Sequence, residues 1–345
     1  MTLMEAVTIV LGVGRGGALG WLLDRSAFSL DRVFRWAVLR DDLTWFRAYA
    51  LALALLWLVI GVAALGPWRD LGQPFAVSPL ASMLAGFVAG LAIGLLADCP
   101  LTLAHGAGRT GLRSGAGFLA WIVGVLLGTH GPLARFFERI QLAGPSEWRE
   151  MRVADLLGVP QWLLLLASGA AVFVWLQRAP VRVAPGTLEW PKQGAGLALL
   201  TLVGWALARW GGELGGLNAV DVVEEGWGAA TGGRLWLAPS LLAGAGFVAW
   251  GFLRSLARRE LFLEPVGSAV ELVILAAAGV LLGLASALAG GDPATRLLFG
   301  MSVLHLGSAI FTLAMCCGAW LVGIMEWKQL GRPGGKPARG RPVET

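Results

Sequence analysis

The sequence predicts an all-α membrane protein that crosses a bilayer about nine times, and three features of its composition support this. First, 57% of the 345 residues are hydrophobic and only 14% are charged, whereas a soluble domain carries about a quarter charged residues. Second, the mean hydropathy of +0.70 is typical of a chain with many spanning segments. Third, the chain holds 50 glycines, and small residues let membrane helices pack closely.

Apolar segments long enough to cross a hydrocarbon core of about 30 Å recur along the chain. Polar or helix-breaking groups end them: Asp24 and Arg25 follow the first segment, and Asp98 and Pro100 follow the third. The predicted spans are residues 4–23, 46–66, 79–97, 115–132, 160–177, 194–209, 236–254, 268–289 and 303–325.

The distribution of basic residues predicts the orientation, because loops on the cytoplasmic side carry an excess of Lys and Arg. The connections on one side, together with the C-terminal tail, hold 18 of these residues, and those on the other side hold 8. We therefore expect a multi-pass protein of a bacterial inner (plasma) membrane, with the N-terminus outside and the C-terminus in the cytoplasm. The basic tail, 326–345, is predicted to be disordered and to anchor at the cytoplasmic surface rather than to bind nucleic acid.

Two short motifs recur in the same order in the two halves of the chain. "GWLLDR" at 20–25 recurs as "GWALAR" at 204–209, and "ADCP" at 97–100 recurs as "GGDP" at 290–293. Thr102 and Thr295 then follow the two prolines at the same distance. An odd number of spans separates the matching segments, so the second half should be inverted relative to the first, as in many transporters.

This pattern predicts four regions. They are a first transmembrane repeat at 1–132, a connecting segment with one transmembrane helix at 133–193, a second, inverted repeat at 194–325, and the tail at 326–345.

Both "ADCP" and "GGDP" place a proline directly after a helix of small residues. A helix that breaks at membrane depth needs partners for its backbone groups, so it must line a cavity or lie buried in protein. Short re-entrant segments entering from opposite faces would bring Cys99 and Asp292 toward the middle of the membrane. The alternative is a pair of ordinary surface turns, because Asp-Pro sequences also favour turns.

Three ordered segments resemble the signatures of the YeeE/YedE sulfur-transport family. "GWLLDRSAFSLDRVFRWAVLRD" at 20–41 is similar to its first signature. The segment at 90–128, which contains "ADCPLTLAHG", resembles the Gly-rich helix with a Gly-Gly-Cys-Pro-like end, and the segment at 281–323, with "AGGDP", resembles the third signature, Ala-Gly-Gly-Cys.

The resemblance implies an hourglass of nine spanning helices plus short re-entrant ones in inverted repeats. It also implies a narrow path for thiosulfate, lined by three cysteines, with no bound cofactor and no metal. Transferred to this chain, the second cysteine is Cys99, the first falls on Ser29 and the third on Asp292. A cytoplasmic sulfur-carrier protein would be a partner, besides the sulfur anion and membrane lipids.

The two replacements change the chemistry of such a path. A Ser29 hydroxyl still donates a hydrogen bond, and more strongly than a thiol. An ionised Asp292 only accepts hydrogen bonds, and it would repel a dianion by about 4 kcal/mol per unit charge pair at ~4 Å and an effective dielectric constant of 20. A protonated Asp292 would instead donate and would couple transport to protons.

Other residues are weaker candidates for the path. Arg25 and Arg209 hold matching places in the repeats and would attract an anion at each mouth or anchor helix ends. His105 and Asp98 lie near Cys99, but no second Cys or His at ligand spacing completes a zinc site. Glu213 falls where the repeat places Ser29.

Two further features are assigned to packing. "GVGRGG" at 12–17 formally fits a dinucleotide fingerprint, but it lies inside a membrane helix without a βαβ context. Cys316 and Cys317 lie within an apolar span and are expected to act as small packing residues.

The sequence thus favours a permease that imports a small, thiosulfate-like sulfur anion at the interface of its two halves. A non-transporting membrane scaffold that keeps the fold, or a transporter of another small solute, is the alternative. An enzyme is not expected, because no paired nucleophile and base is visible.

Overall fold

The protein is an assembly of helices in the computed structural model, which describes residues 3–26, 28–37, 42–66, 77–109, 111–178, 188–211, 218–232, 239–258 and 268–330. The long helices are α1 (Leu3–Ser26), α3 (Thr44–Ala63), α4 (Pro79–Leu96), α6 (Leu112–Thr129), α10 (Gln161–Gln177), α11 (Trp190–Gly211), α13 (Pro239–Arg258), α14 (Ala269–Ala289) and α16 (Leu306–Leu330). The short ones are η1 (Arg32–Trp36), α5 (Pro100–Gly108), α7 (Ala134–Gln141), α8 (Ser146–Glu150), α9 (Val153–Leu157), α12 (Ala219–Ala230), α15 (Pro293–Thr295) and η2 (Arg296–Gly300).

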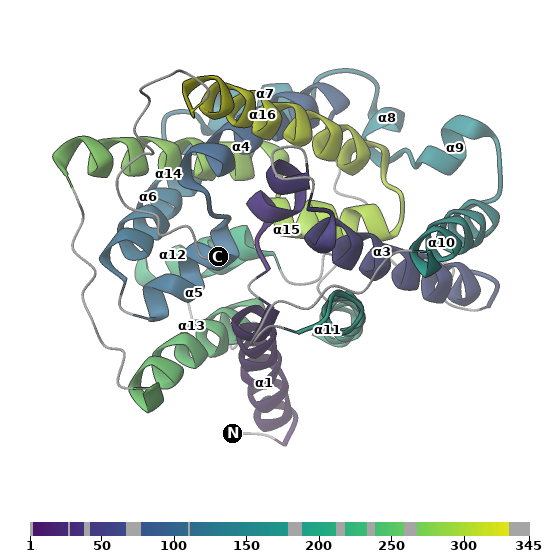
Figure 1. The fold of residues 1–345 in the computed structure, drawn as a ribbon, viewed down its shortest axis with the longest axis horizontal. Coiled ribbons are helices and arrows are strands. Elements are labelled where there is room, and N and C mark those ends of the chain that lie inside the picture. The colour runs from purple at the N-terminus through teal and green to yellow at the C-terminus, as the bar shows by residue number, and fades with distance from the viewer. Residues whose placement is uncertain are drawn as a thin grey trace.

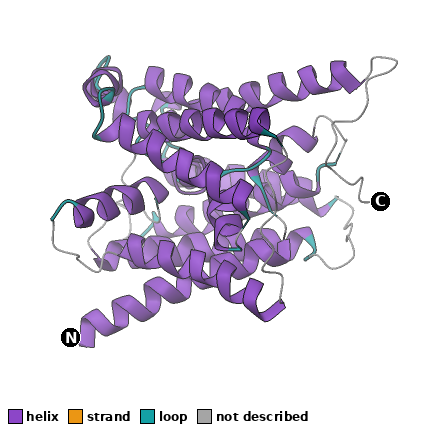
Figure 2. Ribbon diagram, turned by 90° about the vertical axis from the view of Figure 1, so that its left-hand side faces the viewer, coloured by secondary structure: helices purple, strands orange, loops and turns teal. Residues whose placement is uncertain are grey.

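Each predicted span overlaps one of these long helices, so the all-α prediction is confirmed, and Figure 2 shows the helices stacked in layers. Among the described residues, five segments are long and apolar enough to cross a membrane. They are Thr44–Ala63, Pro79–Gly108, Leu112–Thr129, Ala269–Ala289 and Leu306–Glu326. Two shorter apolar helices, Gln161–Gln177 and Leu241–Ala257, accompany them. The chain is therefore a polytopic membrane protein.

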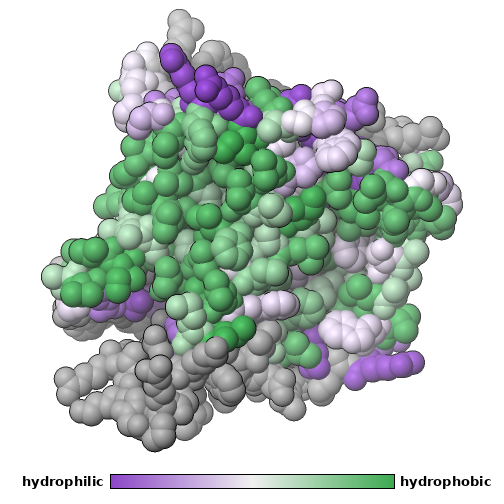
Figure 3. Space-filling model, turned by 90° about the horizontal axis from the view of Figure 1, so that it is seen from above, coloured by the Kyte–Doolittle hydropathy of each residue, from purple (hydrophilic) through white to green (hydrophobic). Residues whose placement is uncertain are grey.

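Hydrophobic side chains cover the middle of the surface, as expected for a protein in a bilayer. Figure 3 shows a broad hydrophobic expanse between hydrophilic patches at the top and the lower right of that face. Large apolar side chains are exposed on several spanning helices, among them Leu119 (64%), Val270 (69%) and Leu313 (68%). Such exposure would be costly in water and suits contact with lipid chains.

Glycines allow the central helices to approach to backbone contact. On α4, a Cβ added at Gly86 or Gly90 would overlap the backbone of Phe311 or Met315 on α16. On α14, a Cβ at Gly283 would overlap the backbone of Trp121 on α6. Helices α4 and α14 each carry glycines four residues apart, Gly86 and Gly90 on the first and Gly279 and Gly283 on the second. This spacing brings membrane helices close together, so α4 packs on α16 and α14 on α6.

Further contacts also join the two halves of the chain (Figure 1). Helix α1 packs against α13, α3 packs against α11, and α4 and α14 pack against each other. Helix α10, from the connecting segment, packs on α3. The first and second halves therefore form one body rather than two separate units.

Two helix ends lie inside this body. Helix α4 ends at Ala97 and α14 at Gly290, both in the left-handed conformation with φ of 57° and 64°. Two residues later, Cys99 and Asp292 are the N-caps of α5 and α15, each followed by proline at the first helical position. Proline is favoured there because its missing N–H needs no partner.

The helices of the connecting segment, α7 to α9, hold the two central helix pairs together. Gln141 of α7 donates to the carbonyls of Ala287 and Leu288 at the end of α14, and its own carbonyl accepts from Ser78 before α4. Farther along, Arg149 offers its carbonyl to His305 Nε2. These short helices were not predicted from the sequence, because each is too short to show a clear apolar period.

Candidate functional site

A small cavity lies between the two interior helix ends. Its volume is about 50 Å³, and both Cys99 and Asp292 line it, together with Thr295. By the measure that one water needs roughly 10–15 Å³, it has room for several waters and is therefore comparable in size to a small inorganic ion. Most of the other lining residues are apolar, and the further polar ones are Arg15, Tyr49 and Thr201.

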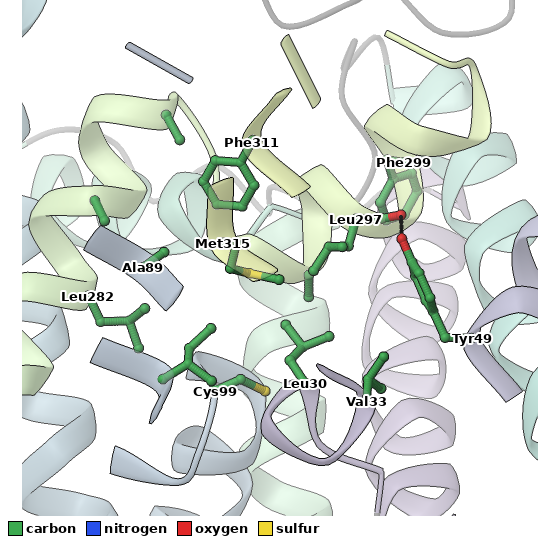
Figure 4. Packing of buried hydrophobic residues seen from close by; sticks show 14 of the residues in the cluster. Leu30, Val33, Tyr49, Ala89, Cys99, Leu282, Leu297, Phe299, Phe311 and Met315 are labelled. Carbon is green, nitrogen blue, oxygen red and sulfur yellow. Dashed lines mark hydrogen bonds between the residues drawn. The ribbon is translucent and has the colours of Figure 1, made fainter. Parts of the chain in front are cut away.

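Cys99 sits at the N-cap of α5 and is 2% exposed. Its backbone N–H donates to Thr102 Oγ1 at 2.8 Å, and that hydroxyl lies 3.4 Å from the sulfur. The backbone N–H of Leu30 also donates toward the sulfur, and Figure 4 shows the Cys99 side chain beside Leu30. The thiol is thus fixed in position, so the wall of the cavity presents it in one orientation.

Ser29 lies in the short connection between α1 and η1, one residue before Leu30. It is 5% exposed, and its neighbours Phe28 and Leu30 line the cavity. Within the part of the chain that the structure describes, its buried Oγ atom has no hydrogen-bond partner. A buried hydroxyl without a partner loses the free energy of that hydrogen bond, so Ser29 has a donor to offer.

Asp292 caps α15 and is 1% exposed. It accepts hydrogen bonds from the backbone N–H groups of Ala294 at 3.0 Å, Thr295 at 3.4 Å and Ala219 at 3.1 Å, and from the Thr295 hydroxyl. Every one of these partners is a donor, which suits an ionised carboxylate because that form only accepts.

Asn218 is a site residue that the sequence reasoning missed. Its side chain caps α12 by accepting from Val220 N, and it also accepts from the backbone N–H of Asp292 at 3.3 Å. The backbone N–H of Ala219 donates to Asp292, as the backbone N–H of Leu30 donates toward Cys99. Asn218 precedes Ala219 as Ser29 precedes Leu30, so Asn218 holds the position relative to Asp292 that Ser29 holds relative to Cys99. Glu213, which the motif spacing placed there, lies outside the described residues.

Arg15 is the second missed residue. It comes from the middle of α1, lines the cavity, and its guanidinium packs over Gly204 of α11. All the other Lys and Arg residues lie in the connections or the tail, at or beyond the ends of the predicted spans. A cation in the middle of a spanning segment is itself a signal for function, but the assignment of "GVGRGG" to helix packing concealed it.

His105, predicted near the path, belongs to a charged cluster around Asp24. The Asp24 side chain is 2% exposed, and its Oδ1 lies 3.2 Å from His105 Nε2 and 3.9 Å from Arg109 Nη1. Its Oδ2 contacts the guanidinium of Arg254. These residues join α1, α5 and α13, so one buried carboxylate holds three elements together.

The structure places the other predicted site residues outside the cavity lining. Thr102 contacts Cys99 as described, and Asp98 lies half-buried beside it, with Arg32 and Arg113 as nearby cations. Arg25 is exposed at the end of α1, where its carbonyl accepts from Leu188 N. Arg209 lies in α11, and its side chain is outside the described residues.

Among the described residues, no group of three or more His, Cys, Asp and Glu side chains is arranged to hold a metal. Cys316 is half-buried and Cys317 exposed, both on α16 and both outside the cavity lining.

No curated protein matches the chain. A family model described as Sulphur transport matches residues 25–321. Because this match covers most of the sequence, the chain belongs to the YeeE/YedE sulphur transport family, and it is a membrane transporter of sulfur compounds.

Proposed function

We propose that the protein imports a small, thiosulfate-like sulfur anion across the inner membrane, through the cavity that Cys99 and Asp292 share. One observation carries this proposal. Two helix breaks, one from each half of the chain, place Cys99 and Asp292 at the same small cavity in an otherwise apolar interior. Irregular backbone at membrane depth is tolerated where it lines a cavity. Transporters place their sites at such breaks.

The pattern of helix contacts supports two inverted repeats, 1–132 and 194–325. If α1 corresponds to α11, α3 to α13, α4 to α14 and α6 to α16, each of the main contacts among these eight helices has a counterpart. The pair α1–α13 becomes α11–α3, and α4–α16 becomes α14–α6. Exchange of partners in this way is what a two-fold axis between the halves would produce, and the cavity lies where the halves meet.

The cavity offers several contacts to an anion. Arg15 contributes a positive charge and the Cys99 thiol contributes a donor. The unpaired Ser29 hydroxyl is not part of the lining, but it lies between two residues that are, Phe28 and Leu30. Asp292 opposes entry of an anion, because its carboxylate is an acceptor and lies in the same wall. The balance of Arg15 against Asp292 would therefore favour a weakly held, transient anion over a tightly bound one, which is what conduction requires.

In the orientation that the charge distribution predicts, the cluster around Asp24 lies toward the cytoplasm. Arg109 and Arg254 exceed the single carboxylate in charge. An anion that leaves the cavity would meet a net positive potential there, and the same potential would attract it away from Asp292.

Protection of cysteines from a thiol reagent tests whether a sulfur anion reaches the cavity. In proteoliposomes, N-ethylmaleimide should label Cys99 slowly, because the thiol is buried, and thiosulfate should slow the labelling further. Cys316 and Cys317 serve as controls in the same chain, and their labelling should not respond to thiosulfate. Protection of Cys316 or Cys317 without protection of Cys99 would show that the path runs elsewhere.

A further inference from the structure

A second, larger cavity lies beside the first and has a different chemistry. Its volume is about 450 Å³, and it is enclosed by α5, α6, α12 and α13 with Leu19 of α1. Every lining residue is apolar or aromatic, including Phe118, Trp121 and Trp227. The indole N–H of Trp121 points elsewhere, to Ser286 Oγ at 3.1 Å. The cavity therefore offers nothing to a polar ligand and much to a hydrocarbon.

The corresponding place in the other half is filled with protein. There η1 buries Val33 and Phe34, and Trp320 of α16 donates to the Phe34 carbonyl at 2.9 Å. Helix α12, whose first residue Ala219 donates to Asp292, buries only Val220. The cavity therefore results from the few side chains that α12 buries, and the fold itself does not require it.

The surroundings of the cavity identify its occupant. Helix α6 is the least buried of the candidate spans, and beside its cavity-lining residues it exposes Leu119 (64%) and Val123 (49%). The apolar cavity wall thus continues into a surface that contacts lipid. An unfilled hollow of this size would forfeit dispersion contacts along its whole lining.

We propose that this cavity binds one acyl chain of a membrane lipid. The acyl chain would lie between α6 and α12, against Phe118, Ile122 and Val223. At the end of α6, the ring of His130 stacks with Trp227 at 6.3 Å between centroids. Aromatic rings of this kind favour the headgroup level, so the lipid headgroup lies at that end. The site depends on the membrane location of the chain and not on the transport proposal.

Two glycines of α12 provide a matched pair of variants. A Cβ added at Gly226 or at Gly228 meets nothing within 4 Å, but only Gly226 lines the cavity. Leucine has a higher helix propensity than glycine, so both substitutions should be compatible with folding. Gly226→Leu fills the site and Gly228→Leu does not.

The test uses photocrosslinking in vesicles of phosphatidylethanolamine and phosphatidylglycerol. A small fraction of the phosphatidylethanolamine carries a diazirine in one acyl chain. In the native protein, the cavity-lining residues Phe118 and Ile122 of α6 and Val223 of α12 should be labelled, as distinct from the lipid-exposed Leu119 and Val123. Gly226→Leu should reduce this labelling several-fold, whereas Gly228→Leu should leave it unchanged. Labelling of the lipid-exposed Val270 and Val273 on α14 is the internal standard.

The proposal is overturned if Phe118, Ile122 and Val223 are not labelled, or if Gly226→Leu leaves their labelling equal to that of Gly228→Leu. If Gly226→Leu does not fold, as judged by size-exclusion chromatography, Ala230→Phe replaces it. Ala230 also lines the cavity, near the end of α12, and the same reduction is required of that variant.

Discussion

At the scale of single residues, Asp292 is the group in the proposed path that differs most from a neutral hydrogen-bond donor. Its carboxylate is fully engaged as an acceptor, by the backbone of α15 and by Ala219 of α12. Ser29, by contrast, keeps an unengaged hydroxyl among the described residues. If Ser29 and Asp292 stand at the sites of the family cysteines, the two replacements are unequal: one preserves a donor and the other adds negative charge.

Restoring both thiols should therefore raise thiosulfate uptake. We expect Ser29→Cys together with Asp292→Cys to transport thiosulfate faster than the native chain, because a neutral donor replaces a repelling charge. Loss of the capping carboxylate also leaves the N–H of Ala219 unpaired, at a cost of about 1–3 kcal/mol in stability. Uptake should accordingly be normalised to folded protein. A folded double variant with unchanged thiosulfate uptake would place Asp292 outside the path.

Only part of this site could be predicted from the sequence. Cys99 and Asp292 were predicted to lie toward the middle of the membrane, because the proline after each is a local signal of a helix break. In the structure they line one cavity. Asn218 could not be found in this way. Its role depends on the cap of α12 meeting Asp292, which lies 74 positions away, and motif spacing carries no information about the length of the intervening loop.

At the scale of helices, buried charge and close glycine contacts hold the elements together. Asp24→Asn should lower the apparent Tm strongly, because it leaves the cations of α5 and α13 without their buried partner. Breaking a buried ion pair costs about 3–5 kcal/mol. Glu271→Gln is the control: its pair with Arg113, at 3.6 Å, is about 40% exposed on both sides and should contribute at most about 1 kcal/mol. Equal effects of the two variants would contradict the assigned role of Asp24.

The close contact between α4 and α16 can be tested with a glycine substitution. Gly90→Ala should destabilise the protein by about 1–3 kcal/mol, since the new methyl group overlaps the Met315 backbone and the helices must separate. Gly115→Ala, on α6, meets nothing within 4 Å and should not reduce stability. Thermal unfolding in detergent would compare them, and a tolerated Gly90→Ala would mean that the two helices pack less closely than described.

Long helices were predictable from the sequence and short ones were not. Each of the nine predicted spans is a run of apolar residues, which a bilayer requires irrespective of packing. Helices α7 to α9 exist because tertiary contacts stabilise them, such as the bonds of Gln141 to the end of α14. A segment that gains its stability from distant residues leaves little trace in its own sequence.

At the scale of the whole molecule, the proposed inversion of the two halves fixes which side each loop faces. Reporter fusions within residues 178–193 and at the C-terminus should both be cytoplasmic, because both are placed by the same excess of Lys and Arg. A fusion within 130–160 should report the opposite side. If 178–193 or the C-terminus reported the outside, the halves could not be inverted as proposed.

Uptake by proteoliposomes tests the central claim most directly, namely that the protein moves a small sulfur anion past Cys99. Radiolabelled thiosulfate, sulfite and sulfide would be offered separately. We expect vesicles with the native protein to accumulate at least one of them faster than empty vesicles. Cys99→Ala should reduce that rate by about tenfold, equivalent to ~1.4 kcal/mol, and Cys317→Ala should leave it unchanged. Uptake of none of the three, or full uptake by Cys99→Ala, would contradict the account.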